Sequence, residues 1–238
     1  GRSLSTLRGH KSNVTAAEFS PDGTKVVTAS MDNTAITWNV PTGKSLSTLH
    51  GHKSNVTAAE FSPDGTKVIT TSVDGTAIIW DVSTGRSLST LRTNEGSYVN
   101  TAEFSPDGTK MVTTEDGAAI IWNVSTGKRL STLREHGNNI KTATFNPDGT
   151  KVVTVSWDGN AIIWDISTGK KLYTLYGHES CVNTARFSPD GKKIVTVSCD
   201  KTARIWNIPE PQELIDKVLD ILNGYKLSPE DRKRYYLE

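Results

Sequence analysis

Side chains suited to acid–base chemistry recur at a fixed spacing along this 238-residue chain. Four of the five histidines are each followed, 22 residues later, by an aspartate, which gives the pairs His10 and Asp32, His52 and Asp74, His136 and Asp158, and His178 and Asp200. A Ser/His/Asp or Cys/His mechanism needs a base and its orienting group to converge on a nucleophile. We find no such set outside the recurring positions, so the sequence predicts a protein that is not an enzyme and has no catalytic residues.

Composition narrows the possible partners. The chain has 27 Lys and Arg against 26 Asp and Glu, a net charge of +1, which gives no electrostatic reason to bind nucleic acid or an anionic membrane. Two cysteines are too few for a disulfide scaffold, and no apolar stretch approaches the ~18 residues of a membrane span. The Asp-Gly turns recur too regularly for phosphate or calcium loops. We expect a cytoplasmic protein without a targeting signal, metal or cofactor.

An internal repeat organises most of the chain. Residues Gly9–His50 and Gly51–Arg92 are identical at 33 of 42 positions, and three further copies follow at Thr93–Arg134, Glu135–Tyr176 and Gly177–Ile208. Each copy carries an apolar run ending in Phe, a Pro-Asp-Gly turn, a second apolar run, an Asp turn and a run ending in Trp. These turns divide each copy into four short strands and predict an all-β protein of five units.

The repeat resembles that of the WD-repeat β-propeller family. It has a period near 42, and its copies begin with Gly-His at Gly9, Gly51 and Gly177 and include Trp-Asp at Trp80 and Trp164. The resemblance implies a five-bladed propeller of four-stranded antiparallel blades over residues 1–208, acting in protein recognition.

The family pattern also implies a structural role for the recurring polar residues. In each blade a loop His, a strand Thr, a turn Asp and a strand Trp are expected to bond in sequence, as His10, Thr28, Asp32 and Trp38 would in the first. Buried polar groups are tolerated only when they are paired in this way. The third copy has no His, so we expect an incomplete network and a less rigid loop there.

Closure of the ring is predicted from the two ends of the repeat region. The fifth copy stops after its third strand, and Gly1–Arg8 is identical to Gly85–Arg92, a fourth strand with its leading turn. We expect Ser3–Leu7 to pair with the third strand of the fifth blade and close the ring, which would hide two sheet edges. The protein would then be a monomer, and otherwise a homo-oligomer.

One position differs in every copy against a nearly constant background. The residue before the turn Asp is Met31, Val73, Glu115, Trp157 and Cys199 in turn, and the family places it on the narrow face of the disk beside residues such as Tyr98 and Lys141. Exposed Trp and Tyr dominate binding hot spots. The pattern predicts a protein-binding or peptide-binding site at these seven positions, the alternative being drift at solvent-exposed sites.

Two smaller groups are of interest. Cys181 and Cys199 should lie close together on neighbouring strands, where a disulfide or a metal pair is conceivable, but two reduced thiols are expected. Glu18, Glu60, Glu103, Thr144 and Arg186 are expected to border the central channel.

Residues 209–238 break the repeat, and their apolar residues recur at helical spacing, which predicts a short helical tail. Its Pro-Gln-Glu-Leu-Ile-Asp segment resembles tails that follow propellers in bacterial NTPase and WD-repeat signalling proteins, where the propeller acts as a sensor. The predicted function is therefore non-enzymatic protein recognition or scaffolding, and the resemblance of the tail implies that the propeller acts as such a sensor. The alternative is an excised or engineered propeller fragment with a structural or self-assembly role and no ligand.

Overall fold

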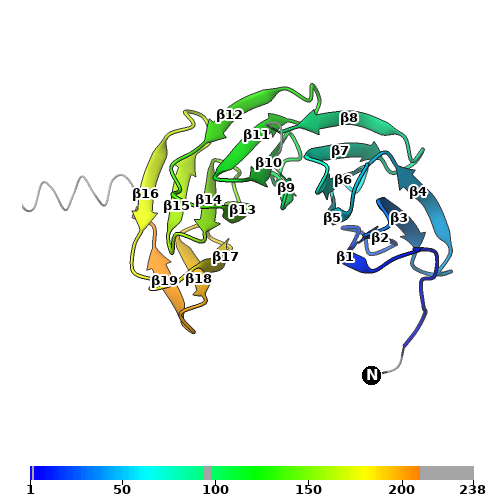
Figure 1. The fold of residues 1–238 in the computed structure, drawn as a ribbon, viewed down its shortest axis with the longest axis horizontal. Coiled ribbons are helices and arrows are strands. Elements are labelled where there is room, and N and C mark those ends of the chain that lie inside the picture. Colours follow the sequence, from blue (N-terminus) through cyan, green and yellow to red (C-terminus); the bar gives the residue numbers. More distant parts are fainter. Residues whose placement is uncertain (2, 94–97, 210–238) are drawn as a thin grey trace, which may run out of the picture.

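The computed structural model describes residues 1, 3–93 and 98–209 of the 238-residue chain. Within these ranges nineteen strands form five antiparallel sheets, one for each copy of the repeat, and the strands of each sheet pair in chain order (Figure 1). The all-β propeller architecture and the division into five blades are confirmed. No helix in the described part is long and apolar enough to span a membrane.

The strands of the five blades have the following bounds. Blade 1 contains β1 (Val14–Phe19), β2 (Lys25–Ser30), β3 (Thr34–Asn39) and β4 (Ser45–His50). Blade 2 contains β5 (Val56–Phe61), β6 (Lys67–Ser72), β7 (Thr76–Asp81) and β8 (Ser87–Arg92). Blade 3 contains β9 (Ala102–Phe104), β10 (Lys110–Glu115), β11 (Ala118–Asn123) and β12 (Arg129–Leu133). Blade 4 contains β13 (Ile140–Phe145), β14 (Lys151–Ser156), β15 (Ala161–Asp165) and β16 (Lys171–Leu175), and blade 5 contains β17 (Val182–Phe187), β18 (Lys193–Ser198) and β19 (Ala203–Asn207).

The Pro-Asp-Gly turns join the first two strands of each blade. In blade 1 the Gly23 N–H donates to the Ser20 carbonyl at 2.8 Å, and Gly23 has a φ of 68°, which side chains with a Cβ rarely adopt. The Asp22 carboxylate accepts the Thr24 N–H at 2.9 Å and the Ser20 hydroxyl at 2.6 Å. The conserved turn sequence of the copies therefore fixes the hairpin register in each blade.

Apolar residues fill the space between consecutive blades. Val27 and Leu49 of blade 1 pack in one cluster with Val56, Phe61 and Trp80 of blade 2. The later pairs of blades form clusters of equivalent residues. Each of the three inner blades thus buries one sheet face against the blade before it and the other against the blade after it.

A hydrogen-bonded chain runs across four of the five blades, as the family pattern implies. In blade 4, His136 Nδ1 lies 2.8 Å from Asp158 Oδ2, and His136 Nε2 lies 2.8 Å from Thr154 Oγ1. The indole N–H of Trp164 donates to the same Thr154 oxygen at 2.8 Å. Blades 1, 2 and 5 repeat this arrangement, so four histidines serve the structure.

Blade 3 keeps only part of this chain. Trp122 donates to Thr113 at 2.8 Å, but the sequence has no His in this copy to continue it. The predicted incomplete network is confirmed to that extent. The expected looser loop falls on residues 94–97, which lie outside the described residues.

The five blades form an open arc and not a closed ring. Blade 1 and blade 5 stand at opposite ends of the arc (Figure 1), and the sheet of blade 5 has three described strands, β17, β18 and β19. The predicted pairing of Ser3–Leu7 with blade 5 is wrong in this structure, since these residues form no strand and Leu4 is fully exposed. The physical reason is that the repeated packing between blades sets the curvature, and at this curvature the ends of five blades do not meet.

The division of the chain at residues 208 and 209 stays a prediction. The helical tail that we expect lies at residues 210–238, outside the described residues.

The network in blade 4 gives a stability prediction. Thr154→Val removes the oxygen that Trp164 and His136 both contact, and each buried polar group left without a partner costs about 1–3 kcal/mol. Thr113→Val in blade 3 is the matched control. Thr113 accepts the indole N–H of Trp122, but the sequence of this copy has no His to contact it. We expect a clearly larger fall in the free energy of unfolding for Thr154→Val in urea titrations; equal losses would contradict the proposed role of the histidine.

Candidate functional site

Trp157 lies at the centre of the candidate binding surface, since it lines two depressions. It follows β14 in the turn that begins blade 4's second hairpin, where its N–H donates to the Asn139 carbonyl at 3.2 Å. More than half of the Trp157 side chain, 56 %, is exposed, whereas the repeat tryptophans are buried or half-buried. The turn therefore holds the backbone of this residue while its indole ring faces solvent.

Lys141 on β13 lies against this indole. Its ammonium nitrogen is 4.1 Å from the centre of the Trp157 ring, a cation–π contact, and it donates to Asn183 Oδ1 at 2.5 Å. A depression of about 530 Å³ on this side is lined by Tyr98, Asn100, Asp116, Asn139, Lys141, Trp157 and Asn183. It combines two exposed aromatic rings with amides that can both donate and accept hydrogen bonds.

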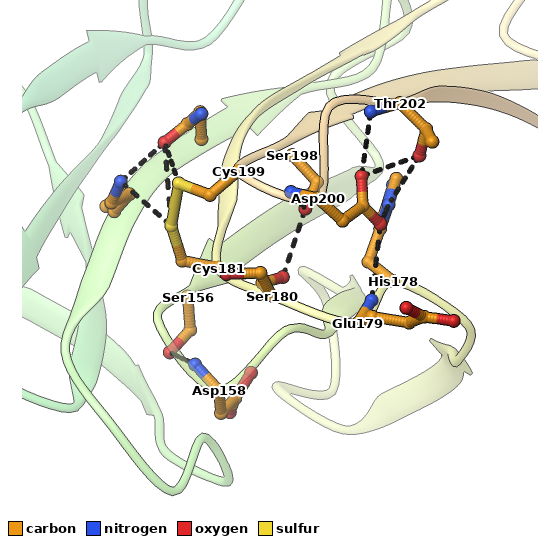
Figure 2. The surroundings of a disulfide bond; sticks show 12 residues. Ser156, Asp158, His178, Glu179, Ser180, Cys181, Ser198, Cys199, Asp200 and Thr202 are labelled. Atoms are coloured by element: carbon orange, nitrogen blue, oxygen red, sulfur yellow. Dashed lines mark hydrogen bonds and ion pairs between the residues drawn. A yellow bond between two sulfur atoms is a disulfide. The ribbon is translucent and has the colours of Figure 1, made fainter.

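A disulfide bond joins Cys181 and Cys199 on the other side of Trp157. Their Cα atoms are 5.4 Å apart, and the Cys199 N–H donates to the Cys181 carbonyl at 2.9 Å. Figure 2 shows this bond beside the turn in which Asp200 contacts His178 and Thr202. The expectation of two reduced thiols is therefore wrong; the hairpin register of β17 and β18 brings the two sulfur atoms into bonding distance.

The disulfide also borders a second depression, of about 550 Å³. Its lining includes Trp157, His178, Glu179, Cys181 and Cys199. Asn183 Oδ1 lies 3.4 Å from the Cys199 sulfur, and the Lys141 ammonium lies 3.6 Å from the Cys181 sulfur. Trp157 thus stands between two depressions, and the disulfide and Lys141 connect them.

The structure brings together four of the seven predicted site residues: Tyr98, Lys141 and Trp157 line one depression, and Trp157 and Cys199 line the other. Met31 is exposed and Val73 is partly exposed on blades 1 and 2, and neither lines these depressions. Glu115 is not brought to this surface. The turn of its copy is one residue shorter, so Glu115 continues β10 opposite Ala118, and its side chain is fully buried with Arg134 Nη2 3.6 Å from Oε1.

Sequence reasoning missed how the glutamates on the inner strands join consecutive blades. Glu18 accepts the Phe61 N–H at 2.8 Å, Glu60 accepts the Phe104 N–H at 3.1 Å, and Glu103 accepts the Phe145 N–H at 2.9 Å. Figure 1 shows that their strands β1, β5 and β9 lie on the inner side of the arc. The signal was present in the sequence, since each Glu directly precedes the Phe that ends the strand and recurs with the repeat.

Desolvation changes the acidity of these carboxyl groups. Desolvation, with repulsion from Glu103 and Glu18, raises the pKa of Glu60 to about 8. Desolvation also raises the pKa of Glu103 to about 6, although the Phe145 N–H and Arg186 act in the opposite direction, and it raises the pKa of Glu18. In the part of the chain that the structure describes, no three His, Cys, Asp or Glu side chains converge as metal ligands would.

Five repeated antiparallel sheets, four of them with four described strands, and the hydrogen-bonded chain of His, Thr, Asp and Trp in four of the blades define the class of protein as a propeller of WD type. Models of protein families agree: the WD domain, G-beta repeat matches residues 1–39, 43–81 and 169–207, and the NWD2 C-terminal beta-propeller matches residues 74–162. The chain belongs to the WD-repeat β-propeller family.

A relative among known proteins matches a single repeat. The U3 small nucleolar RNA-associated protein 21 of Saccharomyces cerevisiae is 48% identical over 42 residues, which is 18% of this chain and 4% of that protein. This chain therefore spans only a small part of its relative's length. The similarity is that of one blade and is no guide to the partners of the whole protein.

The raised pKa of Glu60 predicts a pH-dependent stability. The folded state holds a proton on Glu60 up to about pH 8, whereas the unfolded chain loses it near the ordinary value of 4.5. The folded state therefore binds more protons between these values, so the free energy of unfolding falls as pH rises through this window. Glu60→Gln keeps an oxygen for the Phe104 N–H and should flatten the dependence in thermal unfolding at pH 5 and pH 8.5. The exposed Glu179→Gln is the control; an unchanged slope in Glu60→Gln would contradict the assignment.

The disulfide gives a second prediction for this region. Its cysteines are separated by 18 residues, and closing a loop of this length stabilises a fold by about 3 kcal/mol. We expect Cys181→Ser with Cys199→Ser to lower the free energy of unfolding by that order, and a reductant to destabilise the wild type but not this variant. Maleimide labelling of both cysteines in unreduced, denatured protein would show instead that the bond does not form.

Proposed function

We propose that this propeller is a non-enzymatic recognition module that binds a peptide segment of a partner protein on the face centred on Trp157 and Tyr98. A WD-repeat propeller fits a protein-interaction module in general, and the proposal concerns where this one binds. The observation that carries it is the exposed pair of aromatic side chains, Trp157 at 56 % and Tyr98 at 52 %, lining one depression.

The chemistry of the surface suits a peptide. The two rings offer flat apolar area to a partner side chain at small cost in conformational entropy, as binding hot spots commonly do. Asn100, Asn139 and Asn183 provide amide groups that match the N–H and C=O groups of a peptide backbone. Lys141 and Asp116 add one positive and one negative group at the edges.

The balanced charge of the chain argues against nucleic acid as the partner, because phosphate binding needs a basic surface. The finer assignment, a sensor propeller of a bacterial NTPase and WD-repeat signalling protein, rests on tail residues outside the described part and stays a prediction. The cytoplasmic location is also a proposal. Disulfides are rare in the cytosol, so the redox state of Cys181 and Cys199 in the native cell bears on it directly.

The test is a selection of peptides from a displayed random library on the wild-type chain. The intrinsic fluorescence of Trp157 should change when a selected peptide binds, and the double substitution Trp157→Ala with Tyr98→Ala should weaken binding at least tenfold, as the loss of hot-spot residues does. Leu88→Ala, an exposed apolar residue on β8 of blade 2, is the matched control and should leave affinity unchanged. Selected peptides that bind the double variant as tightly as the wild type would refute the proposed site.

A further inference from the structure

The two ends of the arc expose apolar residues that every inner blade buries. We call the sheet face that a blade turns toward the next blade its trailing face, and the opposite one its leading face. Ile205 on the trailing face of blade 5 is 74 % exposed, whereas its counterparts Ile79 and Ile163 are each 1 % exposed. On the leading face of blade 1, Phe19 is 63 % exposed, whereas the counterpart Phe61 is 5 % exposed. Each end therefore presents an apolar surface that the inner blades bury against a neighbour and that the described residues leave exposed.

The N-terminal segment lies on the leading face of blade 1 in the position of a fourth strand. Leu7 packs against Val26, Ile36 and Trp38. Leu49, one repeat later and part of β4, packs in the same way in the cluster of Val68, Ile78 and Trp80. The segment therefore occupies on blade 1 the place that the outer strand of a preceding blade occupies on blade 2.

A contact at the other end of the segment supports this placement. Ser5 lies against Gly43, as Ser47 of β4 lies against Gly85 of blade 2 and Ser89 of β8 lies against Gly127 of blade 3. A Cβ at Gly43 would collide with the Ser5 hydroxyl. The segment thus follows the path of a fourth strand at Ser5 and at Leu7.

The described part of blade 5 has no fourth strand, whereas blade 1 carries the additional N-terminal segment. Among the described residues β19 pairs only with β18, so its other edge has free backbone groups. In each complete blade the third strand pairs with the fourth in one register, which places Thr37 opposite Ser47, Ile79 opposite Ser89 and Ile121 opposite Ser131. The same register would place Ile205 opposite Ser5 and Ala203 opposite Leu7.

We propose that blade 5 of one copy of this chain binds the Ser3–Arg8 segment and the leading face of blade 1 of a second copy. This interface between two copies would have the same contacts as the four interfaces that the chain already forms between its own blades. It therefore needs no new surface and no change in curvature. Binding within one chain would need all four interfaces to shift, because the ends of the arc lie apart (Figure 1). A contact between unlike surfaces of this kind yields either a ring or a longer chain of copies.

The register makes this interface testable by cross-linking. One preparation carries Ser5→Cys and the other Ile205→Cys, both with Cys181→Ser and Cys199→Ser so that no native thiol interferes. Under mild oxidation the mixture should give a covalent species of twice the 25.9 kDa chain mass. Replacing Ser5→Cys by Leu88→Cys, which is exposed but lies on blade 2, should give none.

Native mass provides the second measurement. Light scattering on the wild type should give a multiple of 25.9 kDa, and Ile205→Lys should return the mass to that of one chain. Because Ile205 is exposed in the single chain, this substitution leaves the fold intact, and circular dichroism checks that it does. Leu88→Lys is the control and should keep the multiple.

A mixture of two variants separates the arrangements further. Ile205→Lys retains an intact N-terminal segment, and Leu7→Asp retains an intact blade 5. A mixture of the two variants should therefore form a two-chain species, through blade 5 of the second and the N-terminal segment of the first, that neither variant forms alone. A wild-type mass of one chain, or a cross-link formed only when both cysteines are in the same chain, would overturn the proposal in favour of closure within one chain.

Discussion

The structure depends on the burial of the apolar sheet faces between consecutive blades. A four-stranded sheet with Val, Ile and Leu on each side is unstable alone in water, because nothing covers either face. The repeat solves this by making the faces complementary: Val27 and Leu49 of one blade meet Phe61 and Trp80 of the next. All other features, including the hydrogen-bonded chains and the surface around Trp157, are held in place by this stacking. It also explains why Phe19 at one end of the open arc and Ile205 at the other are exposed, whereas their counterparts in the inner blades are buried.

Most of the fold could be predicted because the same sequence pattern occurs in all five copies of the repeat. A turn that needs a positive φ at Gly23, a strand that ends in Phe and a Trp that donates to a Thr each appear in every copy, so one consistent interpretation accounts for all of them. Closure could not be predicted in the same way. It depends on the angle between blades, which results from side-chain packing and has no sequence signal of its own.

The candidate site shows the same division. Comparison of copies identified Trp157 and Tyr98, because a residue that departs from a constant scaffold is visible in sequence. Glu115 was grouped with them by alignment, but the turn after it is one residue shorter, and in a strand one residue changes the face to which a side chain points. The sequence favours reduced thiols over the disulfide, because formation of the bond depends on the backbone register near Cys181 and Cys199. That register brings their Cα atoms to within 5.4 Å of each other.

The glutamates on the inner strands have both an unfavourable and a favourable effect on the packing of consecutive blades. A Glu in every blade would place like charges in a row. Desolvation, together with repulsion between the carboxylates, raises the pKa values of Glu60 and Glu103. Each carboxyl nevertheless accepts a backbone N–H from the next blade, a contact that links neighbours at their closest approach. The row does not continue: Thr144 takes the position in blade 4 and donates to the Ala185 carbonyl, and Arg186 in blade 5 lies 3.7 Å from Glu103. The copies have therefore diverged where identity would accumulate charge, and have remained alike where identity buries apolar surface.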